Sequence, residues 1–260
     1  MNTRTFLALS TAALGAFLLP QASAAAESGP VYELRIYTTN EGKLPDLLKR
    51  FRDHTCTIFQ KHGIENIGYW VPVDKDKGAD NKLIYIIRHP SREAAKANWA
   101  AFQADPEWQA VAKASEANGK ILAKKPDSIY MTTTAYSPEV KLGGGAEPRT
   151  YELRIYHTPD GKLDDLHARF KNHTIGIFAK HDIPSLAYWT PTDAAQGAGK
   201  TLIYIVSHPS KEAGLKNFEA FRADPDWVAA KAESEKNGPL TLPNGVESTY
   251  MQPTDFSPIK

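Results

Sequence analysis

The hexapeptide YELRIY occurs twice in the chain, beginning at Tyr32 and again at Tyr151. Its apolar and polar residues alternate, so a β-strand presents the Leu and Ile on one face and the Glu, Arg and last Tyr on the other. Each half also contains an unbroken apolar run, LIYII at 83–87 and LIYIV at 202–206. A strand that is apolar on both faces is usually buried on both faces. The pattern therefore predicts a half-polar strand and a doubly buried strand in each half.

The repetition extends over most of the chain. A shift of 119 residues aligns 31–70 with 150–189, and 23 of these 40 positions are identical. Further matches follow, including HPS in both halves and ADPEW against ADPDW. Two copies of about 105 residues indicate two small domains, because solenoids need many shorter repeats.

Each copy has the order strand, helix, strand, strand, helix, strand. Apolar residues recur at helical spacing in 43–62, and Gly63 follows as a stop signal. Asp105 and Pro106 restart the second helical segment, since an acidic N-cap and a proline in the first turn suit a helix N-terminus. This order is the ferredoxin-like pattern of the α+β class, in which both helices cover one face of an antiparallel sheet. In the first copy the predicted elements span 32–37, 43–62, 66–73, 83–88, 91–118 and 128–134.

The doubly buried strand needs a cover on each side, and the helices supply only one. The sheet of the other copy is the economical second cover, so we predict two β-α-β-β-α-β units packed sheet to sheet as an intrachain dimeric α+β barrel. A homodimer of whole chains could supply the same cover, so self-association and the oligomeric state stay open. The predicted organisation is one domain at 31–137, a linker rich in Gly and Pro at 138–149, and a second domain at 150–258.

Residues 1–24 have the features of a secretory signal peptide. Arg4 precedes an apolar run at 6–19, and the small-x-small sequence ASA ends at Ala24. We expect cleavage after Ala24, with Ala26 as the alternative. An uncleaved anchor is disfavoured because the apolar run is short for a bilayer span. The mature protein is therefore expected to be exported, and to be periplasmic in a Gram-negative cell.

Charge and cysteine content narrow the classes of partner. The formal net charge is +1 at pH 7, and loss of a leader with a single arginine leaves zero. A neutral chain with interspersed signs favours neither nucleic-acid nor membrane binding. Cys56 is the only cysteine, and Ile175 stands at the matching position of the second copy. This exchange indicates a packing role for Cys56 in preference to a reactive thiol.

The polar faces of the YELRIY strands carry the candidate site. Between two packed sheets their charges must pair, reach water or bind a ligand, because burying an unpaired charge is costly. The alternative is a face that is simply solvated. We favour a lined cavity between the sheets, since the adjacent strand needs a cover. The candidate ligand-binding residues are Glu33, Arg35, Tyr37, His54, Tyr85, Glu152, Arg154, Tyr156, His173 and Tyr204.

Two of these candidates are histidines that could act as general bases. His54 and His173 lie at helical spacing from the apolar stripe, which predicts either hydrogen-bonded core residues or catalysts. His62 is eight residues from His54, too far along a helix to share a metal ion, and we predict no metal site. His89 and His208 are expected as turn residues at a strand exit, because proline follows each of them. The chain also lacks the phosphate-binding glycine loop, G-x-S-x-G, H-E-x-x-H and C-x-x-C, which removes the usual support for several enzyme classes.

As a set, these motifs resemble the NIPSNAP family. The resemblance rests on YELRIY, on the helix ending H-T-x-x-I-F-x-K-H, on Y-W followed by proline two residues on, and on D-P-[ED]-W. It appears twice and covers 31–258. The resemblance implies the dimeric α+β barrel superfamily, which includes cofactor-free monooxygenases, haem enzymes and small binding proteins. It implies no catalytic motif that can be carried over to this sequence.

Three functions compete. The first is an exported protein that binds a small polar or anionic molecule, with Arg35 and Arg154 as donors, tyrosines as walls and glutamates as orienting partners. The second is an enzyme of the cofactor-independent oxygenase type, with His54 or His173 as base. We expect no cofactor, although haem with one of these histidines as axial ligand is considered. The third is a protein-interaction module without a ligand. Both copies keep every candidate group, so the sequence leaves open whether both function.

Overall fold

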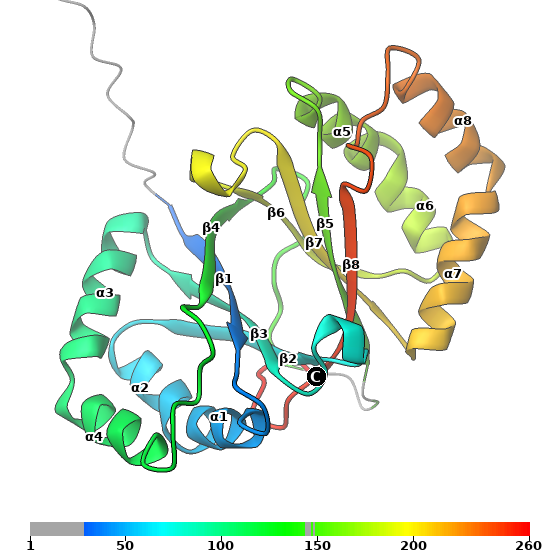
Figure 1. Ribbon diagram of the computed structural model, residues 1–260. Helices are drawn as coiled ribbons and strands as arrows, with labels where there is room; N and C mark the ends of the chain where they lie inside the picture. Colours follow the sequence, from blue (N-terminus) through cyan, green and yellow to red (C-terminus); the bar gives the residue numbers. More distant parts are fainter. Residues whose placement is uncertain (1–28, 144–146, 148) are drawn as a thin grey trace, which may run out of the picture.

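The computed structural model describes residues 29–143, 147 and 149–260, so the predicted signal peptide (1–24) and part of the predicted linker lie outside the described residues. Eight strands form a closed barrel in the order β1-β3-β2-β8-β5-β7-β6-β4. Helices α1–α4 lie on one side of the strands and α5–α8 on the other (Figure 1). The predicted α+β fold with two ferredoxin-like units packed through their sheets is therefore confirmed.

The two repeats have the same sequence of elements. The first contains β1 (Val31–Thr38), α1 (Leu44–Arg50), η1 (Phe51–Thr55), α2 (Cys56–Lys61), β2 (Glu65–Pro72), η2 (Lys75–Lys77), β3 (Lys82–His89), α3 (Arg92–Ala104), α4 (Pro106–Ser115) and β4 (Asp127–Thr133). The second contains β5 (Thr150–His157), α5 (Leu163–Arg169), η3 (Phe170–Thr174), α6 (Ile175–Lys180), β6 (Ser185–Pro191), η4 (Ala194–Gln196), β7 (Thr201–His208), α7 (Lys211–Ala223), α8 (Pro225–Ser234) and β8 (Val246–Pro253).

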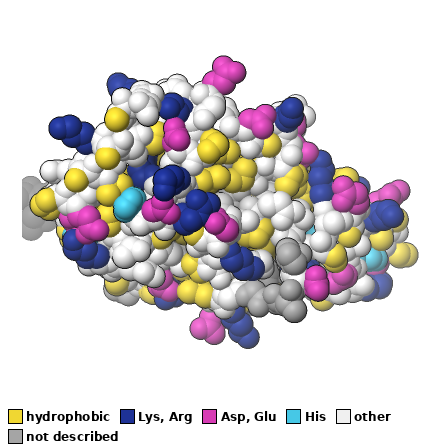
Figure 2. All heavy atoms as spheres, turned by 90° about the horizontal axis from the view of Figure 1, so that it is seen from below, with side chains coloured by type: hydrophobic (Ala, Val, Ile, Leu, Met, Phe, Trp, Pro, Cys, Tyr) yellow, Lys and Arg dark blue, Asp and Glu magenta, His cyan; other side chains and the backbone are white. Residues whose placement is uncertain are grey.

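The outer surface mixes charges of both signs. Figure 2 shows Lys and Arg side chains interspersed with Asp and Glu over the face seen from below. Within the part of the chain that the structure describes, no helix combines the length and apolar character that crossing a bilayer requires.

Edge strands join the two repeats into one barrel. Within the first repeat β3 and β4 both pair with β1, and β2 pairs with β3. The outer strands then pair across the repeats, β2 with β8 and β4 with β6. Since this closure satisfies the backbone groups of edges that would otherwise be open, the two halves form one hydrogen-bonded structure.

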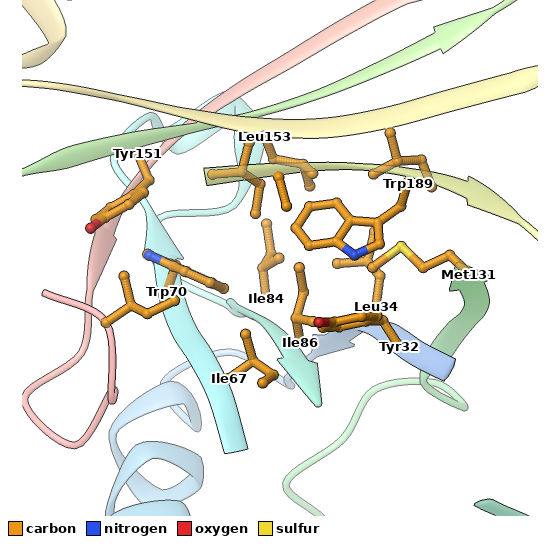
Figure 3. Packing of buried hydrophobic residues seen from close by; sticks show 14 of the residues in the cluster. Tyr32, Leu34, Ile67, Trp70, Ile84, Ile86, Met131, Tyr151, Leu153 and Trp189 are labelled. Atoms are coloured by element: carbon orange, nitrogen blue, oxygen red, sulfur yellow. The ribbon is translucent and has the colours of Figure 1, made fainter. Parts of the chain in front are cut away.

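The space between the two sheets is an apolar core and not the polar cavity that the sequence analysis predicted. Leu34, Ile84, Trp70 and Trp189 point into it and pack with their counterparts from the other repeat (Figure 3). The strand alternation is therefore opposite to the predicted one, with the Leu and Ile of YELRIY inside. The physical reason is that the apolar faces of both sheets are buried against each other, while the charged faces are buried beneath the helices as the ion pairs Glu33–Arg35 and Glu152–Arg154.

The charged face of each YELRIY strand lies beneath the helices instead. Tyr37 and Tyr85 pack with Leu47, Phe51 and Phe59 of the helical layer. The strand β3 is buried on both faces as predicted, since Ile84 and Ile86 face the barrel interior while Tyr85 and Ile87 face the helices. The prediction that Glu33, Arg35, Tyr37 and their counterparts face the other sheet is wrong, and they line the sheet–helix interface.

A π-helical turn in the first helical segment changes which residues of that segment are buried. The residues of η1 (Phe51–Thr55) form a wider turn than an α-helix, and Thr55 Oγ1 donates a hydrogen bond to the carbonyl of Arg50 (3.1 Å). Thr55 is consequently buried, whereas His54 is exposed. The turn η3 repeats this arrangement and leaves His173 exposed. The predicted placement of both histidines on the buried stripe is wrong, because the α-helical spacing does not hold across a π turn.

The segments after β4 and β8 cross to the opposite repeat. Ser137 Oγ accepts a hydrogen bond from the backbone N–H of Tyr188, and Ser257 Oγ accepts one from that of Tyr69, each at 3.0 Å. Phe256 stacks against Phe51 with ring centroids 6.4 Å apart. The matching SP motifs of the two repeats are therefore reciprocal contacts between them.

Candidate functional site

A buried ionic network occupies the sheet–helix interface of the second repeat. Arg154 donates from Nη1 to Glu152, from Nε to Tyr204 Oη (2.8 Å) and from Nη2 to Tyr156 Oη (3.0 Å). Tyr204 Oη in turn donates to Tyr156 Oη (3.0 Å). These residues come from adjacent strands β5 and β7, whose register places Arg154 opposite Tyr204. Four of the predicted site residues are thus in contact, although outside the predicted cavity.

Two further residues hold Glu152 in its ionised form. Ser248 Oγ donates to Glu152 Oε1 (2.6 Å), and His208 Nε2 lies 3.2 Å from Glu152 Oε2. Burial raises the pKa of Glu152, but the His208 contact, the charge of Arg154 and the Ser248 hydrogen bond outweigh it and lower the pKa below its usual value. His89 and its counterpart His208 were expected as turn residues at a strand exit. They do end β3 and β7, but both are fully buried.

The first repeat holds Glu33 with the matching serine and arginine and with one additional donor, Trp99. Ser128 Oγ donates to Glu33 Oε1 (2.6 Å), and Trp99 Nε1 donates to Glu33 Oε2 (2.7 Å). His89 is more distant, with Nε2 3.5 Å from Oε2. Burial raises the pKa of Glu33, while His89, Arg35, Ser128 and Trp99 together lower it to about 2.

The lowered pKa of Glu33 predicts acid sensitivity. A carboxylate that titrates near 4.5 when unfolded and about 2 when folded stabilises the protein above pH 4.5, and this stability is lost as the pH falls through 2. The complete effect is about 3 kcal/mol, of which about 2 kcal/mol is lost between pH 5 and pH 3. Urea unfolding at these two pH values is the measurement, with Glu33→Gln as control. The variant should lose less stability over this interval, and equal losses would contradict the assignment.

A cavity of about 630 Å³ lies beside the second-repeat network, between β5 and the helices. Six aromatic side chains, four cationic side chains and one carboxylate are among the described residues that line it. The lining residues are Arg154, Tyr156, Arg169, Phe170, Thr174, Phe178, Phe218, Phe221, Arg222, Trp227, Val228, Lys231, Ala232, Glu235, Thr241 and Val246.

The cations of this cavity lie at two depths. Arg154 and Arg169 are deep and already paired, Arg154 with Glu152 and Arg169 Nη1 with Glu235 Oε1 (2.7 Å). Arg222 and Lys231 are exposed at the mouth. The deep pairs are close to neutral, so the mouth residues supply the excess positive charge of the lining. An anion is attracted to such a site.

The deep end also keeps unused hydrogen-bond donors. A guanidinium has five N–H groups, and among the described residues Arg154 uses three of them. Tyr156 Oη accepts from both Arg154 and Tyr204, so its own proton has no acceptor among those contacts. Burial raises the pKa of Tyr204 well above its usual value, which keeps that hydroxyl protonated as the donor. The cavity therefore offers donors to a ligand oxygen against aromatic walls.

The structure does not bring the predicted histidines to this cavity. His54 lies in a surface groove with Arg50 and Ala114, and His173 lies in the matching groove of the second repeat. Neither lines the cavity that contains Arg154, so neither is placed to act as a base there. A haem-ligand role for them stays a prediction. Among the described residues, no cluster of three His, Cys, Asp or Glu side chains is arranged to hold a metal ion.

Several lining residues were missed by sequence reasoning. Arg169 was not among the candidate residues, but it is buried with its guanidinium 5.1 Å from the centre of the Trp227 ring. Phe218 lies over Arg154 at 4.5 Å. The available sequence signal was the recurrence of both residues, since Arg50 and Trp108 stand at the matching positions of the first half. In the structure they form the same pair, with the guanidinium 5.3 Å from the ring centre.

Comparison with known proteins agrees with the fold. The sequence profile of the NIPSNAP family matches residues 32–138 and 151–258. No curated protein matches the sequence. The fold resembles that of a monooxygenase-like protein from Lactobacillus acidophilus NCFM, with 11% identity, coverage of 86% of this chain and 94% of that chain, and a TM-score of 0.55.

Two other solved structures give similar values. A monooxygenase-like protein from Fusobacterium nucleatum subsp. nucleatum is 12% identical, with 87% and 93% of the two chains covered and a TM-score of 0.56. An anthrone oxidase-like protein is 16% identical, with 87% and 92% covered and a TM-score of 0.54. At these identities the comparison supports the shared fold over both repeats.

Proposed function

This chain belongs to the NIPSNAP family, and we propose that it is an exported protein that binds a small, flat, anionic molecule in the cavity of its second repeat. An aromatic carboxylate has the required chemistry, with an apolar ring system and one acidic group. The proposal keeps the anionic ligand expected from the sequence but moves it from between the sheets to between sheet and helices.

The observation that carries this proposal is the combination of aromatic walls with fixed donors at the deep end. Arg154 is held by Glu152, Tyr204 and Tyr156, so its unused N–H groups are oriented before a ligand arrives. Preorganised donors lose little entropy on binding. Phe170, Phe178 and Phe221 supply apolar area for the rings. The mouth cations add long-range attraction for an anion.

Anthracene-9-carboxylate is a suitable probe, and isothermal titration calorimetry measures its affinity. We expect binding to the wild-type protein and roughly tenfold weaker binding to the double variant Arg222→Ala/Lys231→Ala, since two exposed cations contribute about 1–1.5 kcal/mol together. The variant Lys96→Ala, which removes an exposed charge from the other repeat, is the control and should bind normally.

The neutral analogue 9-anthracenemethanol separates charge recognition from simple partitioning into an apolar cavity. It should bind more weakly than the carboxylate and should not distinguish the variants. Equal affinity for both molecules, or no binding of either to the wild-type protein, would reject an anion site. The second of these outcomes would favour the alternative of an interaction module without a ligand.

A second candidate is an oxygenase-type enzyme that uses the same cavity. Monooxygenase-like and anthrone oxidase-like proteins share the fold across both repeats, and the unused donors of Arg154 and Tyr156 could stabilise the oxyanion of an enolisable aromatic ketone. Oxygen consumption on addition of anthrone tests this function. Uptake that is reduced in Tyr156→Phe would support the enzyme, whereas tight binding without uptake would favour the binding protein.

A further inference from the structure

We propose that each chain has a single ligand site, in the second repeat, and that Trp99 and Leu122 close the corresponding space in the first. This inference rests on the proposed binding function and adds which repeat performs it. It also assigns the first repeat a structural role, as the partner that completes the barrel.

The deep polar residues are common to both repeats and cannot explain a difference between them. Arg35 and Tyr37 match Arg154 and Tyr156, and Arg50 matches Arg169. The phenylalanines of η1 and α2 are also the same as those of η3 and α6. These residues support the two sheet–helix interfaces in the same way. The differences lie in α3 and α4 against α7 and α8, and in the loops that follow.

The ring above the guanidinium is the first difference. Trp99 in the first repeat and Phe218 in the second each lie 4.5 Å from the guanidinium carbon of their arginine. The indole is larger and also donates a hydrogen bond to Glu33 (2.7 Å), a bond that phenylalanine cannot make. Trp99 is thus held by contacts with both members of the Glu33–Arg35 ion pair.

The hydrogen bonds of the arginine beneath Trp99 also differ from those in the second repeat. In the second repeat Arg154 Nε donates to Tyr204 Oη. The matching atoms of the first repeat, Arg35 Nε and Tyr85 Oη, are buried without a hydrogen-bond partner among the described residues. The first repeat therefore lacks the arginine–tyrosine hydrogen bond that orients the arginine beside the cavity. In its place stands the hydrogen-bonded indole of Trp99.

The cavity wall that follows the last helix is the second difference. Leu122 stands where Thr241 lines the cavity, and its side chain packs against the first repeat's aromatic core. The second-repeat loop is one residue longer and includes Asn244, whose φ of 57° lies in the left-handed region that asparagine tolerates. This longer loop leads to Val246, which lines the cavity. Length and side-chain size both favour an open space in the second repeat.

Charge separates the repeats in the same direction. Arg222 and Lys231 of the cavity mouth are replaced in the first repeat by Gln103 and Ala112. The first repeat keeps the arginines that are paired with carboxylates and lacks these two mouth cations, but it has Lys113 at the position of the lining residue Ala232. It therefore has one cation fewer at the positions that line the second-repeat cavity. A repeat with bulkier residues at two of the lining positions and with fewer cations is less suited to an apolar anion.

Reciprocal exchanges test the inference with anthracene-9-carboxylate. The wild-type protein should bind one molecule per chain in isothermal titration calorimetry. Phe218→Trp/Thr241→Leu, which installs the first-repeat residues in the second, should weaken binding at least tenfold. The matched pair Trp99→Phe/Leu122→Thr should leave this site intact. With Gln103→Arg/Ala112→Lys added, it should raise the stoichiometry towards two.

Three outcomes separate this inference from the proposed function. No binding to the wild-type protein would reject the function itself. Two sites in the wild-type protein, with one lost in Phe218→Trp/Thr241→Leu, would leave the function standing and overturn the single-site inference. Unchanged affinity in Phe218→Trp/Thr241→Leu would overturn the closing role of the exchanged residues. Circular dichroism and a cooperative unfolding transition establish that each variant is folded before its binding is interpreted.

Discussion

Replacing Arg154 by methionine is expected to lower the free energy of unfolding by about 3–5 kcal/mol, because it leaves Glu152 as a buried charge without its main partner. The Glu152 side chain is 1% exposed and that of Arg154 is 14% exposed. Arg154 also supplies the donors for Tyr204 and Tyr156, whose hydroxyls lose them in the variant. Chemical denaturation followed by tryptophan fluorescence measures the loss.

The double variant Glu152→Gln/Arg154→Met distinguishes a charge effect from a packing effect. Removing both charges should recover most of the lost stability, since the penalty belongs to the uncompensated carboxylate. A double variant as unstable as Arg154→Met would contradict this explanation. If the double variant is stable but no longer binds the aromatic carboxylate, the pair has a function beyond folding, because its charges are then dispensable for the fold.

The architecture follows from sequence patterns that leave few physical solutions. An apolar run such as LIYII must be covered on both faces, and the second sheet is the available cover for the face that the helices leave open. The duplicated order of elements then places two four-stranded sheets together. Neither step needs a known relative, and both agree with the observed barrel.

The face of the YELRIY strand that meets the helices could not be predicted from these patterns. Alternation states that Leu34 and Arg35 lie on opposite faces but not which face meets the helices. The choice depends on partners far away in sequence, since Glu33 is satisfied by Trp99 and Ser128. These donors allow the charged face to be buried beneath the helices, and the apolar face is then free to fill the barrel.

The histidine prediction failed for a local reason. A helical stripe assumes about 3.6 residues per turn, and the π turns at Phe51–Thr55 and Phe170–Thr174 contain more. The threonine that ends each turn takes the buried position and bonds back to the chain. Sequence periodicity does not reveal such a turn. The cavity was equally hidden, because its walls come from five separate segments of the second repeat.

Trp189→Ala is expected to destabilise the whole barrel by about 3–5 kcal/mol, the usual cost of deleting a buried tryptophan side chain. Trp189 is fully buried between the sheets, and its ring lies 5.7 Å from that of Tyr32 in the other repeat. Trp70 and Tyr151 repeat this contact at 5.7 Å. Because these pairs cross the repeats and β4 joins β6, both halves should lose stability together, in one cooperative urea transition.

Trp189→Phe is the matched control for this experiment. The indole Nε1 of Trp189 is buried and has no hydrogen-bond partner among the described residues, so phenylalanine removes an unsatisfied donor while retaining most of the ring. The loss should therefore be less than half of that in Trp189→Ala. Two separate unfolding transitions in Trp189→Ala, with the first repeat unaffected, would show that the halves are independent domains. A single transition shifted to lower urea identifies the tryptophan–tyrosine pairs as part of one core shared by both repeats.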